Sequence, residues 1–281
     1  MSERRACKVV GQPRNTQRYA VEPDGEEDRL RQNLREISRK QPRAGYRMAA
    51  RYLRRDGWQI TDKRVHRLWR EEGLKVVRKA RKRARLGRPD QGSQRLRAER
   101  PNQVWSYDFV QDQTRDGRRL KMLCVVDEHT RECLAIHVAR RIRAEDVIQV
   151  VAGLVKERGA PAHLRSDNGP EFIARVLKAW VVGQGVKTLY ITPRSPWENA
   201  YCESFNSRFR DEFLNREEFA TELEAKVLSA EWRRDYNEAR PHSALGDQTP
   251  AEIAARCRVP VGATPLPPHD SVNPKTPTNF S

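Results

Sequence analysis

The sequence predicts an α/β protein, in which a mixed sheet with helices on its faces follows a small all-α region. Two observations lead to this prediction. After residue 101, short apolar runs alternate with segments of helical spacing, and only turns separate the first three runs. Before residue 100, apolar residues recur at helical spacing among many basic residues. We therefore expect two regions with different roles.

The excess positive charge lies entirely in the first hundred residues. The 281-residue chain carries 55 Lys and Arg against 38 Asp and Glu, a net charge of +17. Residues 1–100 hold 30 basic and 13 acidic residues, whereas the remaining 25 and 25 cancel. Such a segment suits a polyanion because each neutralised phosphate releases condensed counterions. Nucleic-acid binding is the favoured interpretation, with a solvated basic face or a ribosomal-type protein as the alternative.

The five cysteines are scattered, and no close pair has the spacing of a metal site. An odd, dispersed set is typical of a reducing compartment. No apolar run is long enough to span a membrane, and the sequence carries no secretory signal. We expect a cytoplasmic protein with no membrane partner.

The first hundred residues divide into three parts. Residues 1–21 form a basic segment whose helical spacing ends at Gly11 and Pro13. After an acidic linker, residues 28–74 predict a helix-turn-helix, in which one helix ends at Asp56-Gly57 and Thr61-Asp62 begins the next.

The second helix of this pair is basic, and Val65, Leu68 and Trp69 lie on its apolar side. In DNA-binding proteins the second helix of such a motif enters the major groove. A helical hairpin that only packs on the core is the alternative. We assign DNA contact to four side chains of this helix: Lys63, Arg64, Arg67 and Arg70.

Residues 75–100 are strongly basic and contain too few apolar residues to build a core. The composition predicts an extended linker that lies on DNA phosphates. Its predicted contacts are Lys79, Arg81, Lys82 and Arg83.

Strands and helices alternate over residues 101–257. The predicted strands are 104–110, 120–126, 133–138, 163–165 and 187–191. The predicted helices are 146–157, 171–182, 199–214 and 222–236. Six prolines after residue 257 predict a disordered tail over 258–281.

Three acidic residues of this region are candidates for chemistry. Asp108 lies inside the apolar strand VWSYDFV, where a buried carboxylate is costly unless a cation accompanies it. Asp167, in RSDNGPEF, follows a strand directly, at the sheet edge where ligands often bind. Glu203 lies in a predicted helix, two turns before Arg210 on the same face. Each taken alone has an ordinary alternative, namely an edge strand, a common turn or a solvated glutamate.

Taken together, three carboxylates suit a hard cation such as Mg²⁺, which prefers oxygen ligands and accepts substrate phosphate oxygens. Two such ions about 4 Å apart support in-line phosphoryl displacement. The combination therefore predicts metal-dependent phosphodiester chemistry.

Longer motifs carry a family resemblance. Asp167 and Glu203 are separated by 35 residues, and SDNGPEF, SPWENAYCESFNSRFRDEFLN and YNEARPHSALGDQTPAE occur in that order. With the SERRAC segment, the helix-turn-helix and the basic linker, they cover residues 1–257. This stretch resembles the catalytic subunit of bacterial insertion-sequence transposases that are made from two overlapping reading frames. More widely, it resembles retroviral integrases and the ribonuclease-H-like superfamily.

The resemblance implies a ribonuclease-H-like, five-stranded mixed sheet and a DDE integrase core. It also implies roles for single residues. Asp108, Asp167 and Glu203 are the implied catalytic metal ligands for two Mg²⁺ ions, for which Mn²⁺ can substitute. Arg210 is implied to contact the DNA backbone, Asn168 and Gly169 to shape the adjoining loop, and Trp197 and Asn199 to border the site.

The implied activity is DNA transposition, that is, cleavage at the ends of the element and joining of the freed 3′-hydroxyl to DNA. Implied partners are double-stranded DNA at element ends and target, further copies of the chain, and an upstream-frame helix-turn-helix protein or a fusion with it. The implied location is the bacterial cytoplasm, at the nucleoid. Two alternatives remain, a non-catalytic DNA-binding regulator and a ribonuclease-H-like nuclease without strand transfer. Asp127, His242, Trp58 and Trp69 are expected to be structural.

Overall fold

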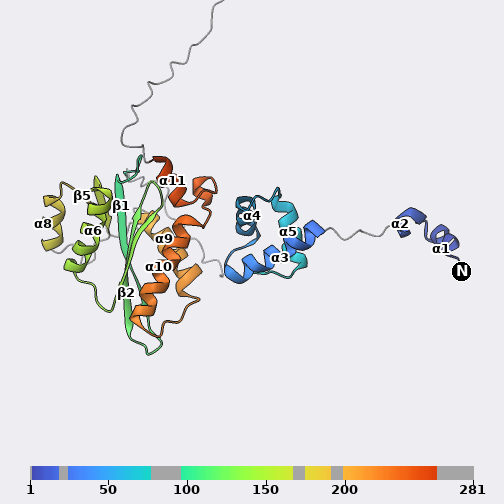
Figure 1. Ribbon diagram of the computed structural model, residues 1–281, viewed down its shortest axis with the longest axis horizontal. Coiled ribbons are helices and arrows are strands. Elements are labelled where there is room, and N and C mark those ends of the chain that lie inside the picture. The colour runs from blue at the N-terminus through green and yellow to red at the C-terminus, as the bar shows by residue number, and fades with distance from the viewer. Residues whose placement is uncertain (1, 19–24, 77–95, 167–174, 191–198, 258–281) are drawn as a thin grey trace, which may run out of the picture.

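A mixed five-stranded sheet forms the centre of the region that follows residue 96, with its strands in the order β3-β2-β1-β4-β5 (Figure 1). The computed structural model describes residues 2–18, 25–76, 96–166, 175–190 and 199–257. The strands are β1 (Val104–Gln113), β2 (Arg119–Asp127), β3 (Cys133–Ala139), β4 (His163–Ser166) and β5 (Lys187–Tyr190). β2 pairs antiparallel with β1 and with β3, whereas β4 pairs parallel with β1 and with β5. The predicted α/β class is confirmed.

Side-chain alternation along β1 determines which helices cover each face of the sheet. Trp105 and Tyr107 point into one core, which α6 (Ala144–Arg158) and α8 (Arg175–Gly183) cover. Val110 points into the other, which packs against α9 (Ala200–Phe209), the π-helical turn η2 (Arg210–Leu214) and α10 (Glu222–Glu238). Figure 1 shows these two helical layers on opposite sides of the strands. Asp108 has the parity of Val110, so its side chain belongs to the α9 side.

An aromatic cluster attaches α9 to the sheet. Phe205 and Phe209 are at most 1% exposed, and the Phe209 ring lies 5.4 Å from that of Phe213 and 4.9 Å from that of Trp232 on α10. Aromatic rings dominate core energetics because each buries a large apolar area. The cluster therefore fixes the axis of α9 against the sheet.

One helix differs from the predicted 199–214, because its last turn is not α-helical. α9 ends at Phe209, and residues Arg210–Leu214 form a π-helical turn. Phe213 and Leu214 are both buried in the same core, at 6% and 5% exposure. The π turn therefore continues the apolar face of α9 against the same core.

Two elements after α10 lack a sequence prediction of their own. These are the short 3₁₀ turn η3 (Ser243–Leu245) and α11 (Pro250–Cys257). Thr249 and Glu252 cap the start of α11 by reciprocal hydrogen bonds between side chain and backbone. This capping box was the sequence signal for a helix at that position.

Three helices with their own apolar core form the predicted helix-turn-helix region. They are α3 (Gly25–Lys40), α4 (Tyr46–Arg55) and α5 (Asp62–Glu71). Leu34, Leu53 and Leu68 are fully buried between them. The Thr61 hydroxyl accepts a hydrogen bond from the Arg64 N–H, as predicted for a helix cap. Ahead of this region lie α1 (Glu3–Val10) and α2 (Arg14–Arg18).

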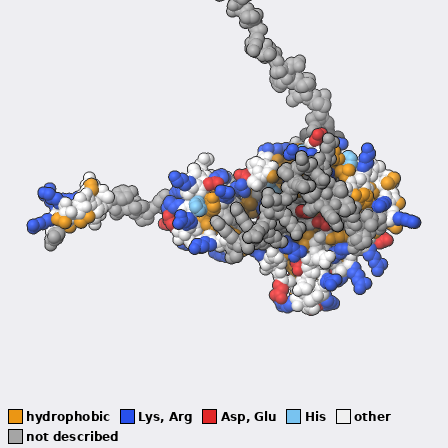
Figure 2. Space-filling view, turned by 180° about the vertical axis from the view of Figure 1, so that it is seen from behind, with side chains coloured by type: hydrophobic (Ala, Val, Ile, Leu, Met, Phe, Trp, Pro, Cys, Tyr) orange, Lys and Arg blue, Asp and Glu red, His pale blue; other side chains and the backbone are white. Residues whose placement is uncertain are grey.

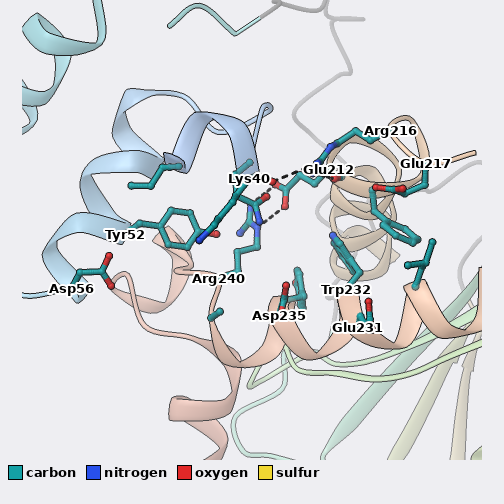
Figure 3. A pocket seen from close by; sticks show the side chains of 16 residues that line it. Lys40, Tyr52, Asp56, Glu212, Arg216, Glu217, Glu231, Trp232, Asp235 and Arg240 are labelled. Atoms are coloured by element: carbon teal, nitrogen blue, oxygen red, sulfur yellow. Dashed lines mark hydrogen bonds and ion pairs between the residues drawn. The ribbon is translucent and has the colours of Figure 1, made fainter. Parts of the chain in front are cut away.

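Arginines of the helix-turn-helix region contact carboxylates of the core. Arg55 of α4 forms two 2.9 Å hydrogen bonds with Glu252 of α11. Arg43 lies 2.7 Å from Asp211. Figure 3 shows the pocket beside these contacts, in which Tyr52 of α4 lies next to the ion pair between Arg240 and Glu212. Burial raises the pKa of Tyr52 to about 12. The two regions are therefore docked through charged groups around a hollow.

Four residues expected to be structural have structural roles. Asp127 is 2% exposed and accepts hydrogen bonds from the N–H groups of Asn102, His129 and Thr130. His242 is 4% exposed and packs edge-on against the Tyr236 ring. Trp69 is buried in the helix-turn-helix core, and Trp58 packs on that core.

Candidate active site

Asp108 lies in the middle of β1, opposite Cys124 of β2, and its carboxylate is half-buried on the α9 side. Its Oδ1 accepts a 2.7 Å hydrogen bond from the Phe109 N–H. Its Oδ2 accepts a 2.8 Å hydrogen bond from the side-chain amide of Asn206 on α9. The carboxylate therefore has a fixed orientation at the junction of strand and helix.

Glu203 lies on α9 one turn before Asn206, on the same helix face. Because Asn206 reaches Asp108, this face meets β1, and Glu203 lies on the side of α9 that carries the Asp108 contact. Desolvation of its carboxylate raises the pKa of Glu203 above its ordinary value. The structure thus brings Asp108 and Glu203 to one side of the sheet.

Asp167 lies outside the described residues, as do Asn168, Gly169 and Trp197. The described part of β4 ends at Ser166, directly before Asp167 in the sequence. β4 pairs in parallel with β1, with Arg165 opposite Ser106. Within the described ranges no three His, Cys, Asp or Glu side chains gather as a metal site.

Arg210 begins the π turn and donates a 2.8 Å hydrogen bond from its guanidinium to the Gln111 carbonyl of β1. Asn206 and Arg210 therefore contact successive parts of the same strand. Asn199 is 2% exposed at the start of α9, and its Oδ1 has no hydrogen-bond partner among the described residues. Asn199 and Arg210 flank the two ends of the helix that carries Glu203.

Sequence reasoning missed Asn206. Its signal was the three-residue spacing from Glu203, because residues i and i+3 share a helix face. A polar amide at this position has little value for packing beside Phe205 and Phe209. Its contact with Asp108 gives the reason for its presence.

A second missed feature is the buried ion pair between Arg165 of β4 and Glu128, which follows β2. The Arg165 guanidinium lies 2.7 Å and 2.8 Å from the two carboxylate oxygens, and the side chains are 4% and 0% exposed. Arg165 also donates to the carbonyl of Leu96, where the described core begins. Arg165 lies two residues before Asp167. Its contacts connect β4 to Glu128, after β2, and to Leu96, the first described residue of the core.

The basic residues predicted to contact DNA fall into three groups. Lys79, Arg81, Lys82 and Arg83 lie outside the described residues. Arg64 and Arg67 of α5 form ion pairs with Glu26 and Glu27 of α3, and the shortest of these, between Arg67 and Glu27, is 2.7 Å. Lys63 and Arg70 line a shallow surface hollow with His66. Figure 2 shows Lys and Arg side chains scattered over the surface of the helix-turn-helix region.

The chain is similar to known protein families over both of its regions. Two models, each described as an integrase core domain, match residues 98–196 and 184–250. A model of an HTH-like domain matches residues 26–83. The chain is 42% identical over 263 residues to the insertion element IS407 uncharacterized 31.7 kDa protein of Burkholderia multivorans. This alignment covers 94% of each chain. It is 30% identical over 227 residues to the transposase InsD for insertion element IS2 of Escherichia coli, covering 75% of this chain and 73% of the relative. The chain belongs to the insertion-element transposases with an integrase core domain.

Members of this transposase family act in DNA transposition and integration and are polynucleotidyl transferases as a class. The fold agrees with that membership. A chain of the simian T-cell lymphotropic virus intasome, in complex with a PP2A regulatory subunit, superposes with a TM-score of 0.50 at 15% identity. The match covers 64% of this chain and 63% of that chain, and it supports the ribonuclease-H-like fold predicted for the core. None of the described helices has the length and apolar character needed to cross a membrane.

Proposed function

We propose that this chain cleaves DNA at the ends of an insertion element and joins the freed 3′-hydroxyl to target DNA, using Asp108, Asp167 and Glu203 as a catalytic carboxylate triad. The observation that carries the proposal is the hydrogen bond from Asn206 to Asp108, because it joins the helix face of Glu203 to the centre of β1. Asp167 follows the last described residue of β4, the strand next to β1. This connection supports its place as the third member.

The donor set suits a divalent metal. All three proposed ligands are carboxylates, and hard cations such as Mg²⁺ prefer oxygen ligands. The carboxylate of Asp108 is held in one orientation by two hydrogen bonds. Glu203 has a raised pKa through burial, which a bound cation would reverse by favouring the charged form. Two Mg²⁺ ions, or Mn²⁺ in their place, would supply Lewis-acid stabilisation of the attacking and leaving oxygens.

The remaining residues of the site bind and orient. Asn206 holds the Asp108 carboxylate, and Arg210, on the same side of the helix, contacts the DNA backbone beside the reacting phosphate. Asn168 and Gly169 shape the adjoining loop, and Trp197 and Asn199 border the site. Lys63, Arg64, Arg67 and Arg70 of α5, with Lys79, Arg81, Lys82 and Arg83, bind the flanking duplex. The partners are element-end and target DNA, further copies of the chain, and the upstream-frame protein or a fusion with it.

Magnesium-dependent nicking of DNA that carries the element's own ends tests the proposal. The wild-type protein is compared with Glu203→Gln, and the upstream-frame product is added to both reactions. Nicking at the element boundary by wild type alone supports the triad, and joining of the cut 3′ end to a second duplex separates a transposase from a nuclease. Equal activity of both proteins would refute the assigned site. Intact DNA binding by wild type without nicking would favour a regulator.

A further inference from the structure

Arginines recur at every fourth position along α4. Arg47, Arg51 and Arg55 lie within the helix, and Arg43 precedes it by the same interval. Residues four positions apart share one face of a helix. The helix itself contains no acidic residue. Arg47, Arg51 and Arg55 therefore form a basic row along one face, which we call the α4 ridge.

Carboxylates of the core are the partners of two of the three ridge arginines. The Nε atom of Arg51 lies 2.7 Å from the carboxylate of Asp247, which follows the turn η3. Arg55 forms its two 2.9 Å hydrogen bonds with Glu252 of α11. The α4 ridge therefore faces the core, and it meets acidic side chains there.

The contact with the core continues toward the start of α4. Arg43, ahead of the helix, lies 2.7 Å from Asp211 of η2. Arg47 lines a hollow of about 240 Å³, to which the core contributes the ion pair between Glu212 and Arg240. Ion pairs between the two regions thus follow the row of arginines from the approach to α4 to its last residue.

This contact is polar and incompletely packed. The side chains of Arg51 and Arg55 are 23% and 30% exposed, and those of their carboxylate partners are 43% exposed. Beside the pairs, a hollow of about 400 Å³ separates Tyr52 of α4 from Trp232 of α10 (Figure 3). Partly exposed ion pairs are weak because water and salt screen them, and polar contacts between regions of one chain open readily. A stronger polyanion can therefore displace the core from the ridge.

The place of α4 in its motif indicates what that polyanion is. In helix-turn-helix proteins the second helix enters the major groove, while the first helix crosses the DNA backbone. Here α5 is the second helix and α4 is the first. The ridge is thus on the helix that is expected to meet phosphates.

Carboxylate and phosphate groups suit the same donors. A guanidinium group binds the oxygens of either anion through its planar fork of N–H groups. Glu252 uses two N–H groups of Arg55 in this way. A phosphate at Arg55 would need the donors that Glu252 now holds, so one arginine cannot serve both anions fully.

We propose that the α4 ridge is a DNA-backbone surface that the core covers in this conformation, so that Asp247 and Glu252 compete with DNA phosphates for Arg51 and Arg55. This inference rests on the proposed function, since it takes DNA as the substrate. A duplex that takes the ridge releases the core from it. Because such coupling is reciprocal, a change that weakens the hold of the core strengthens DNA binding.

The test measures DNA binding by the full chain without metal, so it is independent of cleavage. Fluorescence anisotropy of a labelled element-end duplex is followed at several salt concentrations. The core-side double variant, Asp247→Asn/Glu252→Gln, removes both competing charges and leaves the arginines in place. Asn tolerates the left-handed backbone of position 247, where φ is 65°. Gln can accept the hydrogen bond from the Thr249 N–H that caps α11.

The matched control makes the same charge change elsewhere on the core. Glu145→Gln/Glu157→Gln removes two exposed carboxylates of α6. This helix covers the face of the sheet opposite to α10. The control therefore measures the effect of lower negative charge alone.

We expect the core-side double variant to bind the duplex about fivefold more tightly than wild type, within the usual range of coupling between two sites. A shuffled duplex should show the same gain, because phosphates carry no sequence information. The control should change affinity by less than about twofold, since salt screens distant charges. Adding Arg51→Gln/Arg55→Gln to the core-side variant should weaken binding by at least about tenfold and lower the slope of log affinity against log salt by about two.

Three results would overturn the proposal. Wild-type affinity in the core-side variant would mean that the core does not compete with DNA. An equal gain in the control would make the effect one of net charge. Unchanged affinity and slope after removal of Arg51 and Arg55 would mean that the ridge does not meet DNA. Circular dichroism confirms that each variant is folded.

Failure here and failure of the proposed function are distinguishable. If Glu203→Gln abolishes nicking while the core-side variant binds DNA like its control, only the competition for the ridge is wrongly inferred. If the core-side variant gains affinity while wild type never nicks DNA, only the proposed chemistry fails.

Discussion

The side-chain amide of Asn206 donates a 2.8 Å hydrogen bond to Oδ2 of Asp108, joining α9 to the central strand of the sheet. A residue that orients a metal-binding carboxylate typically contributes 10- to 100-fold to affinity or activity. We expect Asn206→Ala to lower element-end nicking by about tenfold or more. DNA affinity should stay near that of wild type, because the contact is internal. Raising the magnesium concentration should recover part of the rate.

Two variants sharpen this prediction. Asn206→Asp places a like charge beside Asp108 and should lower the rate further than alanine. Ser207→Ala is the control, since Ser207 is the exposed neighbour on the same helix. If Asn206→Ala nicks DNA at the wild-type rate, the hydrogen bond has no role in the site.

Much of this site could be predicted from local sequence, because strand alternation and helix periodicity are local rules. These rules predicted a strand at Asp108 and a single helix that carries both Glu203 and Arg210. The π turn at Arg210 could not be predicted in that way, because the four-residue spacing of Phe205, Phe209 and Phe213 continues through it unchanged. The Asn206 contact spans 98 residues and likewise depends on tertiary packing.

The same limit applies to the basic residues of α5. Composition alone predicts the same DNA contact for Arg64 and Arg67 as for Lys63 and Arg70. The ion pairs of Arg64 and Arg67 with α3 join residues about 40 positions apart, which no local pattern reveals. Charge in a sequence therefore indicates a binding region more reliably than it indicates single contacts.

The buried pair between Arg165 and Glu128 should be important for stability. Removing one partner of a buried pair leaves an uncompensated charge, which costs about 3–5 kcal/mol. We expect Glu128→Gln to lower the free energy of unfolding by about 3 kcal/mol in urea titrations. The double variant Arg165→Met/Glu128→Leu should recover much of the loss, since it removes both charges of the pair together.

An exposed ion pair provides the control for that measurement. Lys226 lies 2.7 Å from Glu222 on α10, and its side chain is 46% exposed. Lys226→Gln should change the free energy of unfolding by less than about 0.5 kcal/mol. A similarly small effect of Glu128→Gln would contradict the assignment of Arg165 as a charged partner that needs this carboxylate.

Docking of the helix-turn-helix region on the core should depend on Arg55 and on pH. The hydrogen bond with Arg55, and secondly that from the Thr249 N–H, lower the pKa of Glu252 from 4.5 to about 2. A pKa lowered by folding gives stabilisation that is full above the unfolded value and is lost as pH falls through the folded one. The contribution of this pair should therefore persist at neutral pH and disappear between about pH 4.5 and pH 2.

Small-angle scattering of the full chain at pH 7 measures the docked state. Arg55→Gln should increase the radius of gyration relative to wild type, because it removes two hydrogen bonds between the regions. Arg39→Gln, an exposed residue of α3, makes the same charge change outside the contact. An unchanged radius for Arg55→Gln would mean that other contacts suffice to hold the two regions together.

The ion pairs of α5 predict an order among its four basic residues in DNA binding. Arg67 lies 2.7 Å from Glu27 and 3.0 Å from Glu71, so DNA must compete with two carboxylates for it. Lys63 and Arg70 are seven residues apart, on one exposed side of the helix. We expect Lys63→Gln and Arg70→Gln each to weaken duplex binding more than Arg67→Gln does, and each to reduce the salt slope by about one. Anisotropy titrations at several salt concentrations give both quantities. An equal loss for Arg67→Gln would mean that its pairs with α3 open when DNA binds, and Glu27→Gln would then strengthen binding by removing the competitor.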